Sequence, residues 1–139
     1  MVFDDKGTNA YLGVDSSAFG IRSVMTFSGS AASPVTNVAG TILAISPDTA
    51  TAIISDTTDV PNQVFICTNC NSTTSHTVAS FQINNATAAS FSPDSLKAYI
   101  VAGSNLYVYS KTDPLQKISL PAPATDAAFI GEGSLGYLA

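Results

Sequence analysis

One phrase occurs more than once in this chain, and it constrains the fold more than any other feature. The stretch FSPDSLKAYIVAG begins at Phe91, and ISPDTATAIISDT begins at Ile45, with Ser-Pro-Asp at the same offset. Weaker copies begin at Phe3 and Phe129, so successive copies are 42, 46 and 38 residues apart. In every copy a small residue and two apolar residues follow at the same distance. A repeat of this length indicates an array of similar structural units.

Each repeat has the pattern of several short β-strands. Small and apolar residues, as in TILAI and TDAAF, predict a first strand. Pro presets the turn dihedral and lacks a donor, and Asp bonds its own backbone, so Ser-Pro-Asp ends that strand in a tight turn. β-branched and aromatic residues then predict a second strand, as in AYIVA, and a third, as in NLYVYS, while TVASFQI predicts a more polar fourth. In the first repeat SSAFGIRSVMTF holds the third strand, and the fourth is poorly marked.

Four short antiparallel strands every 40–45 residues or so are typical of a β-propeller blade. We therefore predict an all-β chain, with residues 1–139 forming a single, incomplete β-propeller domain of about three four-stranded antiparallel blades. The alternative is a β-sandwich of roughly seven strands, in which the turns need not repeat the same residues. Closed propellers have about four to eight blades. Open sheet faces therefore predict either a piece of a longer propeller or copies that associate to close the ring.

The corner phrase resembles the blades of bacterial β-propellers of the YVTN and lactonase-like type, which carry SPDG followed by a Tyr-Val strand. The run SPDSLKAYIVAGSNLYVYS, residues 92–110, is close to that phrase, and SPDTATAIISD is a looser match. Ser95 and Thr49 stand where those repeats usually have Gly. The repeat residues are structural in that family, so the resemblance implies a fold and no catalytic position. It also implies the settings in which such blades occur, which are surface and periplasmic proteins, lactonases and binding modules.

The composition excludes several classes of partner. Of 139 residues, only 11% are charged and five are Lys or Arg, and the formal net charge is −5. Without a basic cluster the chain has nothing to neutralise a phosphate backbone, so nucleic acid is not expected as a partner. The chain has no apolar run of about eighteen residues, so no transmembrane helix is predicted. The N-terminal stretch lacks the pattern of a signal peptide. Low charge with abundant Ser, Thr, Asn and Ala suits an extracellular or periplasmic β-protein.

The motif CTNC, from Cys67 to Cys70, follows the strand QVFI. If Thr68 and Asn69 form a two-residue turn, the cysteines are opposed, and opposed strand residues lie about 4.5–5.5 Å apart. That separation overlaps the range of a disulfide, so we expect a disulfide or inert thiols. Thioredoxin-like redox chemistry would need a helix start. Zinc would need two more ligands, and His76 is the only histidine.

No catalytic, cofactor-binding or metal-binding residue is predicted. His76 lies in a polar connection, and no Ser-His-Asp arrangement can be assembled around it. Asp56 and Asp59 are candidates for a calcium-chelating pair, although their spacing matches no known calcium loop.

We therefore expect a non-enzymatic binding or scaffold module of a larger exported bacterial protein. It would present the variable loops 55–63 and 67–77 to an unknown protein or ligand. The alternative is a piece of a propeller enzyme, such as a lactonase-like hydrolase. Such enzymes gather acidic, basic and His side chains from several blades around the central channel, so most of that set would have to come from further blades. Arg22 and His76 lying together at the channel mouth would favour this alternative.

Overall fold

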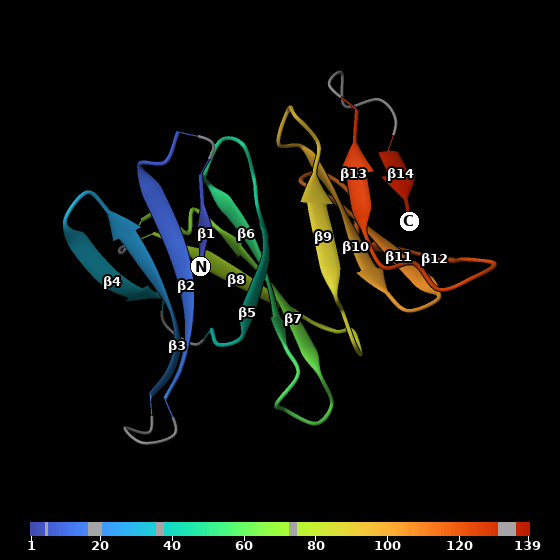
Figure 1. The fold of residues 1–139 in the computed structure, drawn as a ribbon, viewed down its shortest axis with the longest axis horizontal. Helices are drawn as coiled ribbons and strands as arrows, with labels where there is room; N and C mark the ends of the chain where they lie inside the picture. The colour runs from blue at the N-terminus through green and yellow to red at the C-terminus, as the bar shows by residue number, and fades with distance from the viewer. Residues whose placement is uncertain (5, 17–20, 36–37, 73–74, 131–135) are drawn as a thin grey trace.

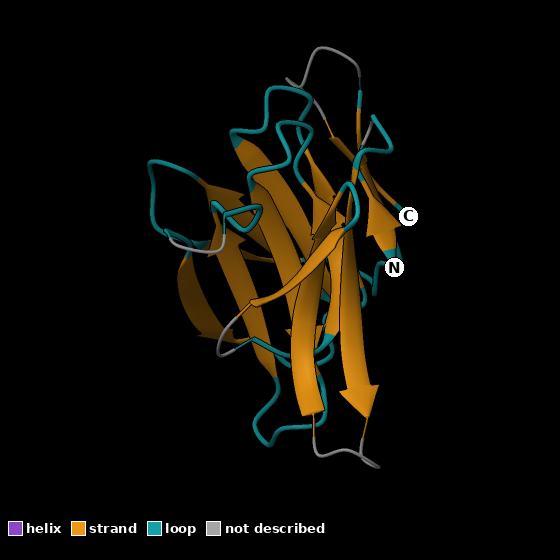
Figure 2. Cartoon of the chain, turned by 90° about the vertical axis from the view of Figure 1, so that its left-hand side faces the viewer, coloured by secondary structure: helices purple, strands orange, loops and turns teal. Residues whose placement is uncertain are grey.

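The computed structural model describes residues 1–139 except 5, 17–20, 36–37, 73–74 and 131–135. Every regular element in these residues is a β-strand (Figure 1, Figure 2), which confirms the all-β fold. The strands are β1 (Val2–Phe3), β2 (Asn9–Ser16), β3 (Ile21–Ser28), β4 (Ala31–Val35), β5 (Thr41–Ile45), β6 (Thr51–Asp56), β7 (Gln63–Thr68), β8 (Thr77–Gln82), β9 (Ala88–Phe91), β10 (Lys97–Ala102), β11 (Asn105–Ser110), β12 (Gln116–Ser119), β13 (Ala127–Phe129) and β14 (Gly136–Leu138). Among the described residues no helix is long and apolar enough to cross a bilayer.

The strands form three four-stranded sheets and a terminal hairpin. The first sheet is β1–β4, the second sheet is β5–β8, the third sheet is β9–β12, and β13 pairs with β14 in the C-terminal hairpin. Within each sheet the strands follow chain order and every pairing is antiparallel. The prediction of four-stranded antiparallel, blade-like sheets is confirmed. A β-sandwich would gather the strands into two layers, which is not the arrangement observed.

The first sheet contains two strands that the sequence pattern left out or marked poorly. β1 pairs with β2 through Val2 and Tyr11, so this sheet has its own first strand. β4 includes Pro34, which is tolerated because β4 is an edge strand and its outer side needs no ladder donor. The described residues therefore form three complete four-stranded sheets followed by a two-stranded hairpin.

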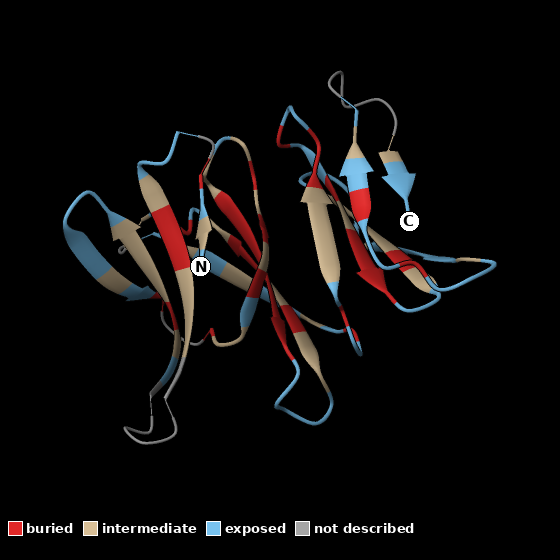
Figure 3. Ribbon diagram, viewed as in Figure 1, coloured by how far each residue is buried: buried red, intermediate tan, exposed pale blue. Residues whose placement is uncertain are grey.

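The sheets pack against one another in series, and most buried residues lie on strands facing a neighbouring sheet (Figure 3). Ile53 of the second sheet and Ile100 of the third belong to one apolar cluster. Tyr11 of the first sheet and Ile54 of the second belong to another. The first strands of successive sheets also touch, because β1 contacts β5, β5 contacts β9, and β9 contacts β13.

The Ser-Pro-Asp corners of the second and third sheets are built alike. In the second sheet the Ser46 N–H donates to the Thr51 carbonyl at 2.8 Å, and the Thr51 N–H donates to Ser46 Oγ at 2.9 Å. Asp48 Oδ1 accepts from Ser46 Oγ at 2.5 Å and from the Ala50 N–H at 3.1 Å. Thr49 has a φ of 62°, in the left-handed region. The side chains of Ser and Asp therefore close the turn by local hydrogen bonds.

Ser92, Asp94 and Ser95 repeat this arrangement between β9 and β10. The Ser92 N–H donates to the Lys97 carbonyl at 2.9 Å, and Asp94 Oδ1 accepts from Ser92 Oγ at 2.6 Å and from the Leu96 N–H at 3.0 Å. Ser95 has a φ of 62°, like its counterpart. The recurrence of the sequence phrase therefore reflects a recurring backbone turn.

In the first sheet Asp4 takes the place that Ser46 has in the second. Its N–H donates to the Asn9 carbonyl at 2.9 Å, and its carboxylate accepts from the Thr8 N–H at 2.8 Å and from Asn9 Nδ2 at 2.7 Å. Gly7 supplies the left-handed residue, with a φ of 66°. Burial alone would raise the pKa of Asp4, but the hydrogen bonds from Asn9 and Thr8 outweigh it and lower the pKa to about 2.

Candidate binding site

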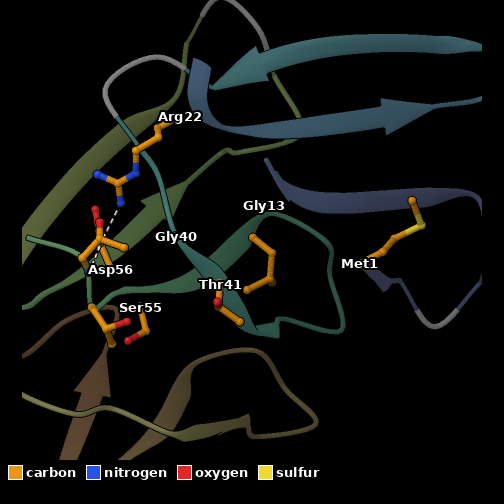
Figure 4. Close-up of a pocket in the computed structure, with 10 residues that line it drawn as sticks. Met1, Gly13, Arg22, Gly40, Thr41, Ser55 and Asp56 are labelled. Carbon is orange, nitrogen blue, oxygen red and sulfur yellow. Dashed lines mark hydrogen bonds and ion pairs between the residues drawn. The ribbon is translucent and has the colours of Figure 1, made fainter. Parts of the chain in front are cut away.

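A cavity of about 310 Å³ lies between the first and second sheets, where β5 begins and β6 ends. Figure 4 shows hydroxyl side chains, two glycines and an ion pair around it. Its lining includes Gly13, Arg22, Gly40, Thr41, Ser55 and Asp56. The volume is at the lower end of the range of about 300–1,000 Å³ that is usual for small-molecule pockets.

Two glycines let the backbone segments around this pocket approach closely. A Cβ atom at Gly13 of β2 would overlap the carbonyl oxygen of Gly40. A Cβ atom at Gly40 would overlap the carbonyl oxygen of Ser55, and Gly40 has a φ of 127°, which L-residues rarely adopt. Any larger residue at Gly40 would push the start of β5 away from the end of β6.

Arg22 and Asp56 form the charged part of the pocket. Arg22 Nη2 lies 2.6 Å from Asp56 Oδ1, and Asp56 is only 2% exposed. The same carboxylate oxygen accepts from the Thr58 N–H at 3.0 Å and from Thr58 Oγ1 at 2.8 Å. Burial alone would raise the pKa of Asp56, but the hydrogen bonds from Thr58 and the charge of Arg22 hold it below its usual value. The pair is therefore ionised and fixed at neutral pH.

The candidate calcium-chelating pair, Asp56 and Asp59, is engaged by Arg22. Besides Asp56, the guanidinium reaches Asp59 Oδ1 at 3.5 Å. A cation between the two carboxylates would have to displace this guanidinium. No cluster of three or more metal-ligating side chains is found among the described residues.

Arg22 and His76 do not come together. Asp56, the partner of Arg22, pairs with Gln63 at one end of the second sheet, whereas Thr51 pairs with Thr68 at the other end. His76 directly precedes Thr77, which also pairs with Thr68. At about 3.3 Å per residue, the five residues from Thr51 to Asp56 separate these ends by about 17 Å. The meeting of Arg22 and His76 that would have favoured the enzyme alternative is therefore not observed.

The loops of the second sheet likewise face opposite directions. The β6–β7 loop, residues 57–62, adjoins the pocket and carries the exposed Val60 and a cis peptide bond before Pro61. The described residues of the β7–β8 loop, 69–72 and 75–76, lie at the far end with His76, whose Nδ1 is 3.3 Å from the Ser72 carbonyl oxygen. The predicted loops 55–63 and 67–77 therefore cannot contact one small ligand together.

Cys67 and Cys70 are joined by a disulfide, with their Cα atoms 5.5 Å apart. The cysteines are not opposed across a two-residue hairpin, because Cys67 of β7 pairs with Val78 of β8. Cys70 lies in the following loop, and its N–H donates to the Ala50 carbonyl at 3.0 Å. Both cysteines are buried in the cluster between the first and second sheets. The disulfide therefore belongs to the core and not to a reactive surface.

The pairing of Arg22 with Asp56 was not visible in the sequence. Thirty-four positions separate the two residues, and the ends of β3 and β6 meet only when the sheets stack. No local spacing signals such a contact.

A comparison with protein-family models gives no match for this chain, and a search of the curated proteins gives none either.

Proposed function

We propose that this chain is a non-enzymatic binding module built of β-propeller blades, which holds a small, neutral, hydroxyl-bearing ligand in the pocket beside Arg22 and Asp56. The observation that carries the proposal is the polar lining of that pocket. The hydroxyl-bearing residues Thr41, Thr57 and Thr58 line it, whereas the Ser55 hydroxyl donates to the Ala86 carbonyl at 3.1 Å. Hydroxyl groups donate and accept, so they match a ligand with the same capacity.

The electrostatics of the pocket favour a neutral ligand over an ion. The charge of Arg22 is balanced by Asp56 at 2.6 Å and by Asp59 at 3.5 Å. An anion would compete with two carboxylates, and a cation would be repelled by the guanidinium. A ligand without charge leaves the buried pair intact, which avoids the cost of uncovering a buried charge.

Three observations support the propeller part of the proposal. The sheets each contain four antiparallel strands in chain order, they pack in series, and their first strands touch one another. A common axis along the first strands accounts for that last contact, since propeller blades place their first strands around a central channel. The resemblance to YVTN-type blades agrees with this arrangement.

The disulfide between Cys67 and Cys70 favours an exported protein. Disulfides persist in oxidising compartments such as the periplasm and the cell exterior, and they are rare where thiols are kept reduced. We therefore propose that the module works outside the cytoplasm, and the resemblance to bacterial blades is the ground for proposing a bacterial source.

Amide NMR spectra of the whole chain, titrated with glucose as the probe, test the binding proposal. We expect shifts confined to the amides of Thr41, Ser55 and Asp56 and their neighbours. Thr41→Tyr would fill the pocket and abolish these shifts. Thr87→Tyr is the matched control, because Thr87 also lies four residues before a repeat start but does not line the pocket. Shifts that survive Thr41→Tyr, or none with the native chain, would refute the pocket as the site.

The enzyme alternative is tested separately with γ-butyrolactone as the substrate. We expect no hydrolysis above the rate of buffer alone, because Arg22 and His76 lie at opposite ends of the second sheet. Turnover that disappears in His76→Ala would contradict a non-enzymatic module.

A further inference from the structure

The same pair of repeat positions contributes to each interface between neighbouring sheets. The first residue of a repeat packs toward the preceding sheet, and the residue eight positions later packs toward the following one. Phe91 of the third sheet and Ile53 of the second lie in the same apolar cluster. Phe129 of the C-terminal hairpin and Tyr99 of the third sheet have ring centroids 4.4 Å apart.

The contact between the first two sheets follows the same rule. Tyr11 is buried in the cluster between these sheets, and Ile45 packs against that cluster. Tyr11 is the eighth residue after Phe3, and Ile45 begins the next repeat. The two equivalent positions therefore lie at the same interface three times within one chain, twice within a shared cluster and once in direct ring contact.

At each end of the stack, one of these two positions has no neighbouring sheet to pack against. Phe3 is equivalent to Phe91 and Phe129, yet it is 60% exposed. Tyr137 is equivalent to Tyr11 and Tyr99, yet it is 65% exposed. The first sheet and the hairpin lie at opposite ends of the molecule (Figure 1).

The free face of the first sheet is apolar across its four strands. Side chains alternate between the two faces of a strand. Tyr11 faces the second sheet, so Ala10 and Leu12 lie on the other face of β2, away from the second sheet. The register places Phe3 beside Ala10 and Met25 beside Leu12. Pro34 lies beside Met25 in turn. Figure 2 views the chain from the side of this sheet. A contiguous apolar face of this kind marks an interaction surface.

We infer that a second copy of this chain covers that face, with its C-terminal hairpin stacked on the first sheet and its Tyr137 against Phe3. The occupant follows from the repeat, because Tyr137 supplies the half of the contact that Phe3 lacks, and Phe3 supplies the half that Tyr137 lacks. The pair would reproduce the contact of Tyr99 with Phe129. This inference does not depend on the proposed ligand pocket, which lies on the other face of the first sheet.

The contact is head-to-tail, and such contacts form rings when the rotation closes. Two copies bring together six four-stranded sheets and two hairpins, eight units in all. That number is at the upper limit of the range of about four to eight blades in closed propellers. A closed pair would leave neither apolar end exposed.

Light scattering on the eluting peak of the purified chain tests this association. We expect twice the monomer mass of 14.3 kDa. Phe3→Asp and Tyr137→Lys should each give monomers, whereas Val60→Asp, a change at an exposed apolar residue away from both ends, should leave the dimer intact. Near-ultraviolet circular dichroism of each variant shows whether its sheets remain packed.

Mixing the two monomeric variants distinguishes head-to-tail contact from a symmetric one. The Phe3→Asp chain keeps Tyr137, and the Tyr137→Lys chain keeps Phe3, so the mixture should form dimers through the one intact contact. A monomeric native chain would overturn the inference. Native dimers that withstand both variants, or folded variants that stay monomeric when mixed, would overturn it equally.

Discussion

The backbone N–H of Asp48 donates a hydrogen bond to Ser95 Oγ at 2.9 Å. This bond joins the corner of the second sheet to the corner of the third, although 47 positions separate the two residues. On the other side of the same corner, the Tyr11 hydroxyl donates to the Thr49 carbonyl at 2.9 Å. Burial, with the carboxylates of Asp4 and Asp48 adding to it, raises the pKa of Tyr11 to about 12, so the hydroxyl stays protonated. The turns that recur in the sequence are therefore connected to one another in space.

Replacing Ser95 by Ala should destabilise the chain. Ser95 is 3% exposed, so its loss leaves the Asp48 N–H without that acceptor, at a cost of about 1 kcal/mol. Urea unfolding followed by circular dichroism measures this change in the free energy of unfolding. Ser104→Ala, at an exposed position, is the control and should have little effect. Equal midpoints for Ser95→Ala and the native chain would show that the bond between corners contributes nothing.

Replacing Thr49 by Gly should stabilise the chain. Thr49 has a φ of 62°, and the left-handed region costs a residue with a Cβ atom about 1–2 kcal/mol. Gly removes that cost but gains entropy in the unfolded chain worth roughly 0.5–1 kcal/mol, so we expect a net gain of about 0.5 kcal/mol. The urea midpoint should rise. Thr87→Gly, where the backbone lies outside the left-handed region, should lower it. A fall in both variants would mean that the Thr49 side chain outweighs its backbone strain.

Thr51 carries a hydroxyl that is buried without a hydrogen-bond partner among the described residues. Because a buried polar group without a partner is unfavourable, Thr51→Val should stabilise the chain by about 1 kcal/mol. Thr51→Ser keeps the hydroxyl and loses the methyl group, so it should destabilise by a similar amount, about 1 kcal/mol. Thermal unfolding of the three chains gives the order Val, Thr, Ser. A lower midpoint for the Val variant would contradict the assignment of an unsatisfied hydroxyl.

The free energy of unfolding should decrease as the pH is lowered, because Asp4 becomes protonated. The folded pKa of about 2 is below the ordinary value of 3.8 for an Asp carboxyl, so the unfolded chain binds more protons between these values. The stabilisation is complete above about pH 4 and is lost as the pH falls through about 2. Urea midpoints between pH 5 and pH 2, measured for the native chain and for Asp4→Asn, isolate this carboxylate from the others. The gap between the two chains should narrow as the pH falls, and a constant gap would contradict the prediction.

Much of the fold follows from local chemistry that repeats. The Ser-Pro-Asp corners, the small residues before them and the β-branched residues after them predicted the strands of the second and third sheets. Those signals are local, because turn geometry and strand preference act over a few residues. Where the residues of the repeat differ, as in the first sheet, the strands were harder to predict. Asp4 performs with its carboxylate what Ser46 does with its hydroxyl, and β4 contains a proline, so neither resembled its counterparts.

The candidate site was less accessible to sequence reasoning. Arg22 and Asp56 were each named as candidates from the sequence, but not as a pair. Their contact depends on how two sheets stack and on the space left by Gly13 and Gly40. The loops 55–63 and 67–77 were both expected to be presented for binding, and the register places them at opposite ends of the second sheet. These relationships are set by long-range packing, which has no signature in residue spacing.

The disulfide between Cys67 and Cys70 has its own consequence for experiment. Both cysteines are buried between the first and second sheets, so a reducing agent can attack the sulfur atoms only after those sheets move apart. The rate at which dithiothreitol cleaves this bond, under conditions that favour the native state, therefore measures how often the first and second sheets separate.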